Sequence, residues 1–139
     1  MNPRAIAASA ARLETPIYAA LRFVAGAMFA FHGAQKILGW LATNPRPAVG
    51  TQLWFGGLIE LGCGSLVALG LFTRPAAFLA AGTMAVAYFQ FHWKLAVANY
   101  AWLPIVNKGE LAALYCFVFL LVMTRGPGYV SLDSALRRR

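Results

Sequence analysis

Four apolar segments, each near the length of a membrane-crossing helix, constrain this sequence more than any other feature. A bilayer core about 30 Å thick requires roughly 20 helical residues. The segments run over residues 16–41, 52–72, 75–94 and 108–124. None of them shows the alternation of period two that a membrane β-barrel requires. They predict an all-α fold: an integral membrane four-helix bundle with antiparallel, up-down-up-down connections.

The composition favours a membrane protein over a soluble bundle. Hydrophobic residues make up 60% of the chain and charged residues 12%, whereas soluble domains carry about 25% charged residues. A soluble bundle would need a charged outer stripe on every helix, and residues 52–72 and 75–94 offer none. Cys63 and Cys116 each lie alone among apolar residues, so neither a disulfide framework nor a structural zinc site is predicted.

Prolines and glycines divide the chain into three parts. Residues 1–15 are predicted to form a cytoplasmic N-terminal segment, residues 16–125 the four-helix domain, and residues 126–139 a cytoplasmic C-terminal tail. Pro16 and Pro75 suit the first turn of a helix, where the missing N–H costs little.

The basic residues predict the orientation. With both termini on one face, that face receives eight basic residues: Arg4, Arg12, Arg22, Arg74, Arg125, Arg137, Arg138 and Arg139. The opposite face receives four: Lys36, Arg46, Lys94 and Lys108. Because basic residues concentrate on the cytoplasmic side, both termini are predicted in the cytoplasm, and the chain is predicted to be a multi-pass protein of the plasma membrane. The net charge of +8 therefore indicates orientation rather than a nucleic-acid partner.

Two groups of residues have predicted roles in packing and anchoring. Small residues at regular helical spacing mark faces where membrane helices approach closely, and they are Gly26, Ala30 and Ala34 in the first segment and Gly57 and Gly64 in the second. Arginines at the inner helix ends are expected to reach lipid headgroup phosphates, and they are Arg22, Arg74 and Arg125.

Five ionisable residues interrupt the apolar segments: His32, Lys36, Glu60, His92 and Glu110. Each costs about 2.5–3.5 kcal/mol at the centre of a membrane helix unless it has a partner, a wet cavity or a function. Counting about 1.5 Å per residue places all five in the outer half of the bundle. His32 and Lys36 are four residues apart and share one helix face.

Several interpretations of these residues remain open. Lys36 also suits a side chain that extends to the outer headgroups, His92 an interfacial position, and Glu110 a first-turn carboxylate stabilised by the helix dipole. An ionised Glu60 would need Lys36, His32 or His92 as its partner, whereas a protonated Glu60 would be a proton carrier. A purely structural ion pair between the first two helices is the alternative for Glu60.

Short strings along the chain resemble the DoxX family of small four-helix bacterial membrane proteins. They are His32-Gly33-Ala34-Gln35-Lys36, Gly57 to Gly64 around Glu60, Leu69-Gly70-Leu71-Phe72-Thr73-Arg74, Asn107-Lys108-Gly109-Glu110-Leu111, and Gly126-Pro127-Gly128-Tyr129-Val130-Ser131-Leu132-Asp133. The fourth string resembles the family's Asn-Gly-Gly-Glu element, with Lys108 in place of a glycine. The resemblance implies a four-helix fold in the plasma (inner) membrane of a bacterium and a connection with thiosulfate-to-quinone electron transfer. The paired cysteines that thiol chemistry would require are missing here.

The first functional hypothesis is a quinone-linked membrane redox component. A quinone head group needs an apolar slot, hydrogen-bond partners for its oxygens and groups that carry protons. The predicted catalytic residues are Glu60, His32, His92 and Glu110. The predicted quinone-binding residues are His32, Lys36, Trp54, Phe91 and Trp93. No flavin, haem or nucleotide motif accompanies them, so the electrons would come from a partner protein.

The second hypothesis is a non-catalytic accessory subunit of a larger membrane complex, in which the outer polar cluster only joins helices. Under either hypothesis the partners are the lipid bilayer and other membrane subunits or a second copy of the chain, with no nucleic acid. A metal site built from His32, His92, Glu60 and Glu110 was weighed as a third hypothesis. The four residues lack the tight spacing of helical metal motifs, so no metal is predicted.

Overall fold

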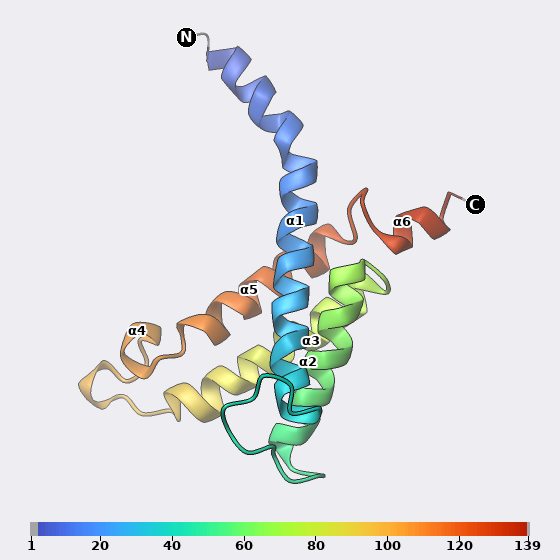
Figure 1. Ribbon diagram of the computed structural model, residues 1–139. Coiled ribbons are helices and arrows are strands. Elements are labelled where there is room, and N and C mark those ends of the chain that lie inside the picture. Colours follow the sequence, from blue (N-terminus) through green and yellow to red (C-terminus); the bar gives the residue numbers. More distant parts are fainter. Residues whose placement is uncertain (1–2, 139) are drawn as a thin grey trace.

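The computed structural model describes residues 3–138, and it is helical without any strand over that range (Figure 1). Its six α-helices are α1 (Pro3–Ile37), α2 (Gln52–Leu69), α3 (Thr73–Ala87), α4 (Pro104–Asn107), α5 (Glu110–Arg125) and α6 (Leu132–Leu136). A π-helix, η1 (Tyr88–Trp93), continues α3 directly, and a short 3-10 helix, η2 (Ala98–Tyr100), follows it. The all-α prediction is confirmed. Residues 1, 2 and 139 of the predicted terminal segments lie outside the described residues, as does the side chain of Arg4.

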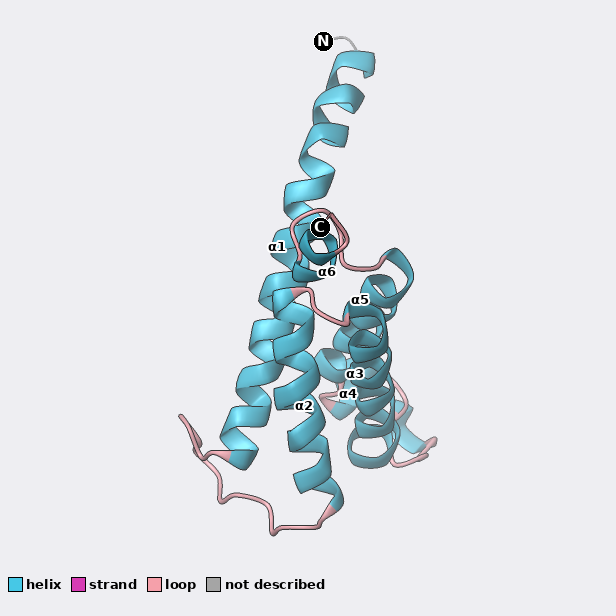
Figure 2. Ribbon diagram, turned by 90° about the vertical axis from the view of Figure 1, so that its right-hand side faces the viewer, coloured by secondary structure: helices cyan, strands magenta, loops and turns pink. Residues whose placement is uncertain are grey.

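The four long helices form two packed pairs. α1 lies along α2 and α3 along α5, and α2 also contacts α3 (Figures 1 and 2). The core where the pairs meet contains large side chains from α1, α2 and α5 opposite small ones from α3. Its fully buried members include Phe29, Val67, Phe119, Val122, Ala77 and Ala80.

Two helical segments are long and apolar enough to cross a membrane by length and composition. They are Ala11–Ile37 within α1 and all of α2. Two of the four predicted spans thus pass this test. α3 and α5, with 15 and 16 residues, are shorter than the roughly 20 residues that a bilayer requires, although η1 lengthens α3 at its C-terminal end.

The predicted start of the first helix is wrong. α1 begins at Pro3, and Pro16 lies inside it rather than in its first turn. Alanine is the strongest helix former, and the alanine-rich stretch before Pro16 continues the helix although proline removes one backbone hydrogen bond. The first part of α1 therefore projects beyond the other helices (Figure 1). The helix also ends at Ile37 rather than at residue 41, just before Gly39 with its positive φ of 74°.

Close contact between the backbones of α1 and α2 confirms the predicted packing faces. A Cβ added to Gly26 would lie 2.5 Å from the Ala68 nitrogen, and one added to Gly64 would lie 2.5 Å from the Ala30 nitrogen. A Cβ added to Gly33, which is not among the predicted packing residues, would clash with the Leu61 backbone in the same way. These positions require glycine because nothing else fits between the two helices.

The structure corrects the prediction that Arg22 reaches lipid headgroups. Its side chain is buried, with 3% of the residue exposed. Nη1 donates to the carbonyl oxygens of Val67 and, at 2.8 Å, Ala68, and Nη2 donates to that of Val130 at 2.6 Å. Carbonyls in the last turn of a helix lack intrahelical partners. Arg22 therefore caps the C-terminal end of α2 and links it by a hydrogen bond to the segment before α6.

Asp133 of α6 closes the start of α3 in a complementary way. Its carboxylate accepts hydrogen bonds from the backbone nitrogens of Phe72 and Thr73, at 2.9 and 3.0 Å, and from the Thr73 hydroxyl at 2.9 Å. Burial by itself raises the pKa of Asp133, but these hydrogen bonds and the nearby charge of Arg137 outweigh it and leave the pKa below its usual value.

Arg74 likewise donates to the carbonyls of Met123 and Thr124 at the end of α5, both at 2.7 Å. We call Arg22, Arg74 and Asp133, together with the backbone groups they bind, the arginine cluster. The C-terminal tail therefore packs on the helices, because Val130 and Asp133 take part in this cluster.

Candidate functional site

A cavity of about 760 Å³ lies between the two helix pairs. All four long helices and η1 contribute to its walls, which are mainly apolar and include Phe29, Phe55, Ile59, Phe78, Leu79 and Phe91. Ligand sites for small molecules are typically 300–1,000 Å³ with apolar walls and few polar groups. The size and lining of this cavity match that description.

Lys36 and Glu60 form an ion pair in the cavity wall. The Lys36 ammonium lies 2.5 Å from Glu60 Oε1. Of the three predicted partners for an ionised Glu60, which were Lys36, His32 and His92, it is Lys36 that forms the ion pair. The close approach of α1 and α2 makes this possible, because a Cβ added to Gly57, one turn before Glu60, would lie only 2.9 Å from the Lys36 Cβ.

The second oxygen of Glu60 is unpaired. Glu60 is 3% exposed, and its Oε2 has no hydrogen-bond partner in the described part of the chain. A buried carboxylate oxygen without a partner loses its hydration and gains no replacement. Glu60 therefore carries, beside the cavity, a hydrogen-bond acceptor that no described residue uses.

Tyr115 supplies a second unpaired group to the same cavity. It is 6% exposed, and its hydroxyl finds no partner among the described residues. Its ring stacks on Phe119, with centroids 5.6 Å apart, and meets the edge of His32 at 6.4 Å. Tyr115 is not among the site residues predicted from the sequence. A tyrosine within an apolar helix is nevertheless a usable signal, because a buried tyrosine hydroxyl usually has a hydrogen-bond partner.

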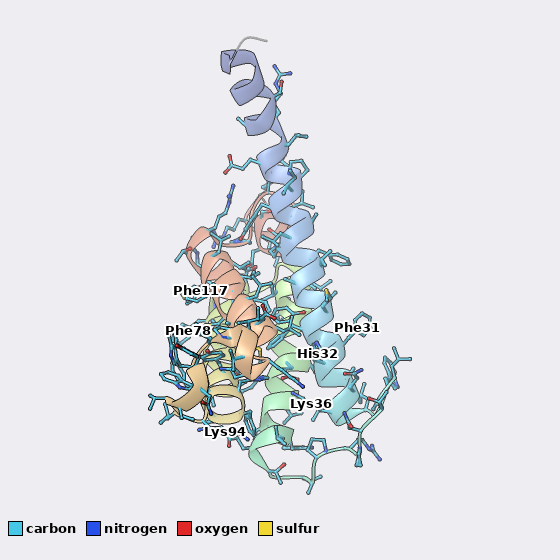
Figure 3. The ribbon with its side chains drawn as sticks, turned by 90° about the vertical axis from the view of Figure 1, so that its left-hand side faces the viewer. Phe31, His32, Lys36, Phe78, Lys94 and Phe117 are labelled. Atoms are coloured by element: carbon cyan, nitrogen blue, oxygen red, sulfur yellow. The ribbon has the colours of Figure 1, made fainter. Side chains whose placement is uncertain are left out.

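The two predicted histidines line the cavity from opposite helix pairs. His32 turns from α1 toward the other helices, whereas the neighbouring Phe31 points away from them (Figure 3). His92 lies in η1, and its Nδ1 is 3.3 Å from the Asn107 carbonyl oxygen. Both side chains are partly buried. π-Helical turns occur often at functional sites, so the location of His92 in η1 fits a role in the site.

Asn107 organises the loop beside the cavity and was also missed as an individual residue. Its side chain donates to the Ala101 carbonyl at 2.9 Å and accepts from the Gly109 nitrogen at 2.8 Å. Lys108, which lines the cavity, has a φ of 59°, a conformation that glycine adopts most easily. This explains why a glycine would suit the position that Lys108 occupies here.

The structure does not bring three of the predicted site residues into the cavity wall. Glu110 is exposed at the first position of α5, where the helix dipole favours a carboxylate. Trp54 lines a separate, smaller cavity near Arg46. Trp93 donates from its indole nitrogen to the Ala96 carbonyl at 2.8 Å. The predicted residues that do line the main cavity are His32, Lys36, Glu60, Phe91 and His92.

Neither a metal site nor a disulfide is formed by the residues described. Within residues 3–138, no three His, Cys, Asp or Glu side chains are grouped so that they could hold a metal ion. Cys63 and Cys116 are both free.

Comparison with known proteins places the chain in a family. The model of the DoxX family matches residues 17–93. A protein of Haemophilus influenzae, described as an uncharacterized protein, is 42% identical over 117 residues, which cover 82% of this chain and 86% of that protein. No solved structure matches. These matches confirm the resemblance seen in the sequence strings: the chain belongs to the membrane-associated DoxX family.

Proposed function

We propose that this protein binds a quinone of the membrane pool in the main cavity and acts as a quinone-linked redox component. The observation that carries the proposal is one apolar cavity whose wall also contains the Lys36–Glu60 ion pair, Tyr115 and two histidines. A quinone head group carries oxygens on opposite sides of an apolar ring, and a cavity with polar groups among apolar walls suits such a molecule.

The proposed topology is a four-helix, antiparallel, multi-pass bundle in the plasma (inner) membrane with both termini in the cytoplasm. Large apolar side chains are exposed along the long helices, among them Phe23, Phe31, Leu114 and Phe117. Exposed apolar surface of this extent is unfavourable in water but is solvated by lipid. The excess of basic residues on the side of the termini supports the orientation.

The route by which a quinone would reach the cavity runs between α2 and α3. Phe55 of α2 and Phe78 and Leu79 of α3 belong to the cavity wall and are each more than half exposed. An opening lined by such side chains faces lipid in the proposed topology. A lipid-soluble molecule could therefore enter sideways from the bilayer, with its apolar tail remaining between the helices.

The proposed chemistry divides the work between this chain and a partner. Reduction of a quinone to a quinol consumes two electrons and two protons. The electrons would come from a partner redox protein, and the protons would pass through Glu60, His32 and His92, which line the cavity. Glu110 lies outside the wall and would serve only in delivering protons from the surface.

Binding of a short-chain benzoquinone to the purified protein in lipid nanodiscs tests the proposal. We expect saturable quenching of tryptophan fluorescence, with affinity for the quinone about 5-fold lower in Tyr115→Phe and at least 10-fold lower in His32→Ala. Glu14→Gln, an exposed carboxylate outside the cavity that pairs with Arg125 at the end of α5, is the matched control and should bind like the wild type. Quinone-dependent activity in native membranes should decrease in the same two variants. Unchanged binding and activity in both cavity variants would contradict the proposal.

The projecting part of α1 favours the second candidate, an accessory subunit of a larger membrane complex. This part extends beyond the other helices (Figure 1), and Leu13 within it is 55% exposed. A helix that extends beyond its own bundle offers a surface on which another membrane subunit can pack. Native electrophoresis after mild solubilisation should then show the chain in a larger assembly, and a chain that always migrates alone contradicts this candidate.

A further inference from the structure

We infer that the cavity selects a head group that donates a hydrogen bond, so that it holds a quinol more tightly than the corresponding quinone. The inference rests on the proposed quinone binding and deepens it by naming which member of the redox pair the site prefers. It follows from the hydrogen-bonding character of the atoms that the cavity leaves unpaired.

Glu60 carries the discrimination. Its Oε1 is paired with the Lys36 ammonium at 2.5 Å, while Oε2 is buried and unpaired. A carboxylate in an ion pair offers only acceptors. A quinone carbonyl also offers only acceptors, so that placing it against Oε2 sets two lone pairs against each other. A quinol hydroxyl instead donates to Oε2 and forms a charge-assisted hydrogen bond.

Tyr115 contributes to binding without discriminating. Its buried hydroxyl has no partner within the described residues, and a phenolic hydroxyl both donates and accepts. It can therefore donate to a quinone carbonyl or to a quinol oxygen equally well. Loss of this hydroxyl should weaken both ligands by a similar factor, which makes Tyr115 a matched control for Glu60 in the same cavity.

The remaining polar groups of the wall do not reverse the preference. Lys36 and Lys108 are donors, and the imidazoles of His32 and His92, the amide of Gln52 and the hydroxyl of Thr83 can each donate as well as accept. The donors bind a carbonyl oxygen, but a quinol oxygen accepts from them too. Glu60 Oε2 is the one buried atom of the described wall that is restricted to accepting and lacks a partner.

The test compares one short-chain benzoquinone with its quinol, prepared by chemical reduction and kept under argon, on the intact protein in nanodiscs. A charge-assisted hydrogen bond corresponds to roughly 10-fold or more in affinity, so the quinol should bind at least 10-fold more tightly. In Glu60→Gln the preference should fall to less than 3-fold, because an amide both donates and accepts. In Tyr115→Phe both ligands should weaken by about 5-fold while their ratio is unchanged.

A ligand variant keeps the inference testable even if Glu60→Gln does not fold. The dimethyl ether of the quinol has the same ring and tail but no hydroxyl to donate, and it should lose at least 10-fold in affinity on the wild-type protein. Equal binding of quinol, ether and quinone, or tighter binding of the quinone, would overturn the inference and leave the proposed function standing. Failure of the quinone and the quinol alike to bind would overturn the proposed function itself.

Discussion

Buried charged side chains occur in two regions of this molecule, and the two regions treat them differently. In the arginine cluster, the terminal nitrogens of Arg22 bind carbonyls at the end of α2 and before α6, and the oxygens of Asp133 bind nitrogens at the start of α3. Within the described residues, Arg22 Nε is the one buried side-chain atom of the cluster without a partner. In the cavity, Glu60 has one partner and Tyr115 none among the described residues. Polar groups in the first region hold the ends of helices together, while two oxygens in the second have no hydrogen-bond partner within the described residues.

The largest expected effect is on stability in the arginine cluster. Arg22→Met keeps much of the side-chain volume but leaves the carbonyls of Val67, Ala68 and Val130 without this donor. Unsatisfied buried acceptors cost about 1–3 kcal/mol each, so we expect the free energy of unfolding to fall by about 3 kcal/mol. Denaturant titration in detergent micelles measures it, with the exposed Arg12→Met as the control. Equal losses of stability in Arg22→Met and Arg12→Met would show that Arg22 stabilises the fold no more than an exposed arginine does. The contrast between the arginine cluster and the cavity would then disappear.

A smaller loss is expected at Asp133. Asp133→Ala removes the acceptor for Phe72, for the Thr73 backbone and for the Thr73 hydroxyl. Loss of a side-chain cap typically costs about 1–2 kcal/mol, and the same titration should show that decrease. Asp133→Asn retains one acceptor oxygen and should recover part of the stability. An alanine variant as stable as the wild type would show that α6 docks without this cap.

The lowered pKa of Asp133 predicts the pH dependence of the same contact. Its stabilising contribution is complete above the pKa of an aspartate in the unfolded chain, about 3.9, and is lost as the pH falls through the lower pKa of the folded state. The stability difference between the wild type and Asp133→Asn should therefore shrink on acidification below about pH 4. Unfolding titrations at several pH values would show it, and a difference that is constant or grows on acidification contradicts the assignment.

The smallest effect on stability is expected in the cavity. Tyr115→Phe removes a hydroxyl that makes no hydrogen bond within the described residues, so the free energy of unfolding should change by less than about 0.5 kcal/mol or increase slightly. Denaturant titration of wild type and variant side by side checks this. A clear loss of stability would show that the hydroxyl is structural and that the cavity resembles the arginine cluster after all.

Periodicity and spacing were sufficient to predict the helical class, the approximate extents of α2 and α5, and the close packing of α1 on α2 through Gly26, Gly57 and Gly64. The same reasoning located His32, Lys36, Glu60 and His92 at similar depth, because depth follows from counting residues along a helix. All four line one cavity.

The remaining features depend on which way side chains point after the helices pack. Arg22 was interpreted as a lipid anchor, because a linear sequence does not reveal that three backbone carbonyls converge on it. Tyr115 was missed because an unpaired hydroxyl becomes visible only when its surroundings are known. The predicted helix start at Pro16 is wrong because the helix-forming strength of the preceding alanines outweighs one missing hydrogen bond.

The glycine contacts between α1 and α2 have a mechanical consequence. The backbones that touch at Gly26, Gly33 and Gly64 cannot separate without losing these close contacts, so we expect α1 and α2 to move as one unit. A change in the width of the cavity would then involve tilting of the α3–α5 pair against α1 and α2, about the short turn of residues 70–72. Asp133 holds this turn through hydrogen bonds to Phe72 and Thr73, so the C-terminal tail is joined to the point about which that pair would tilt.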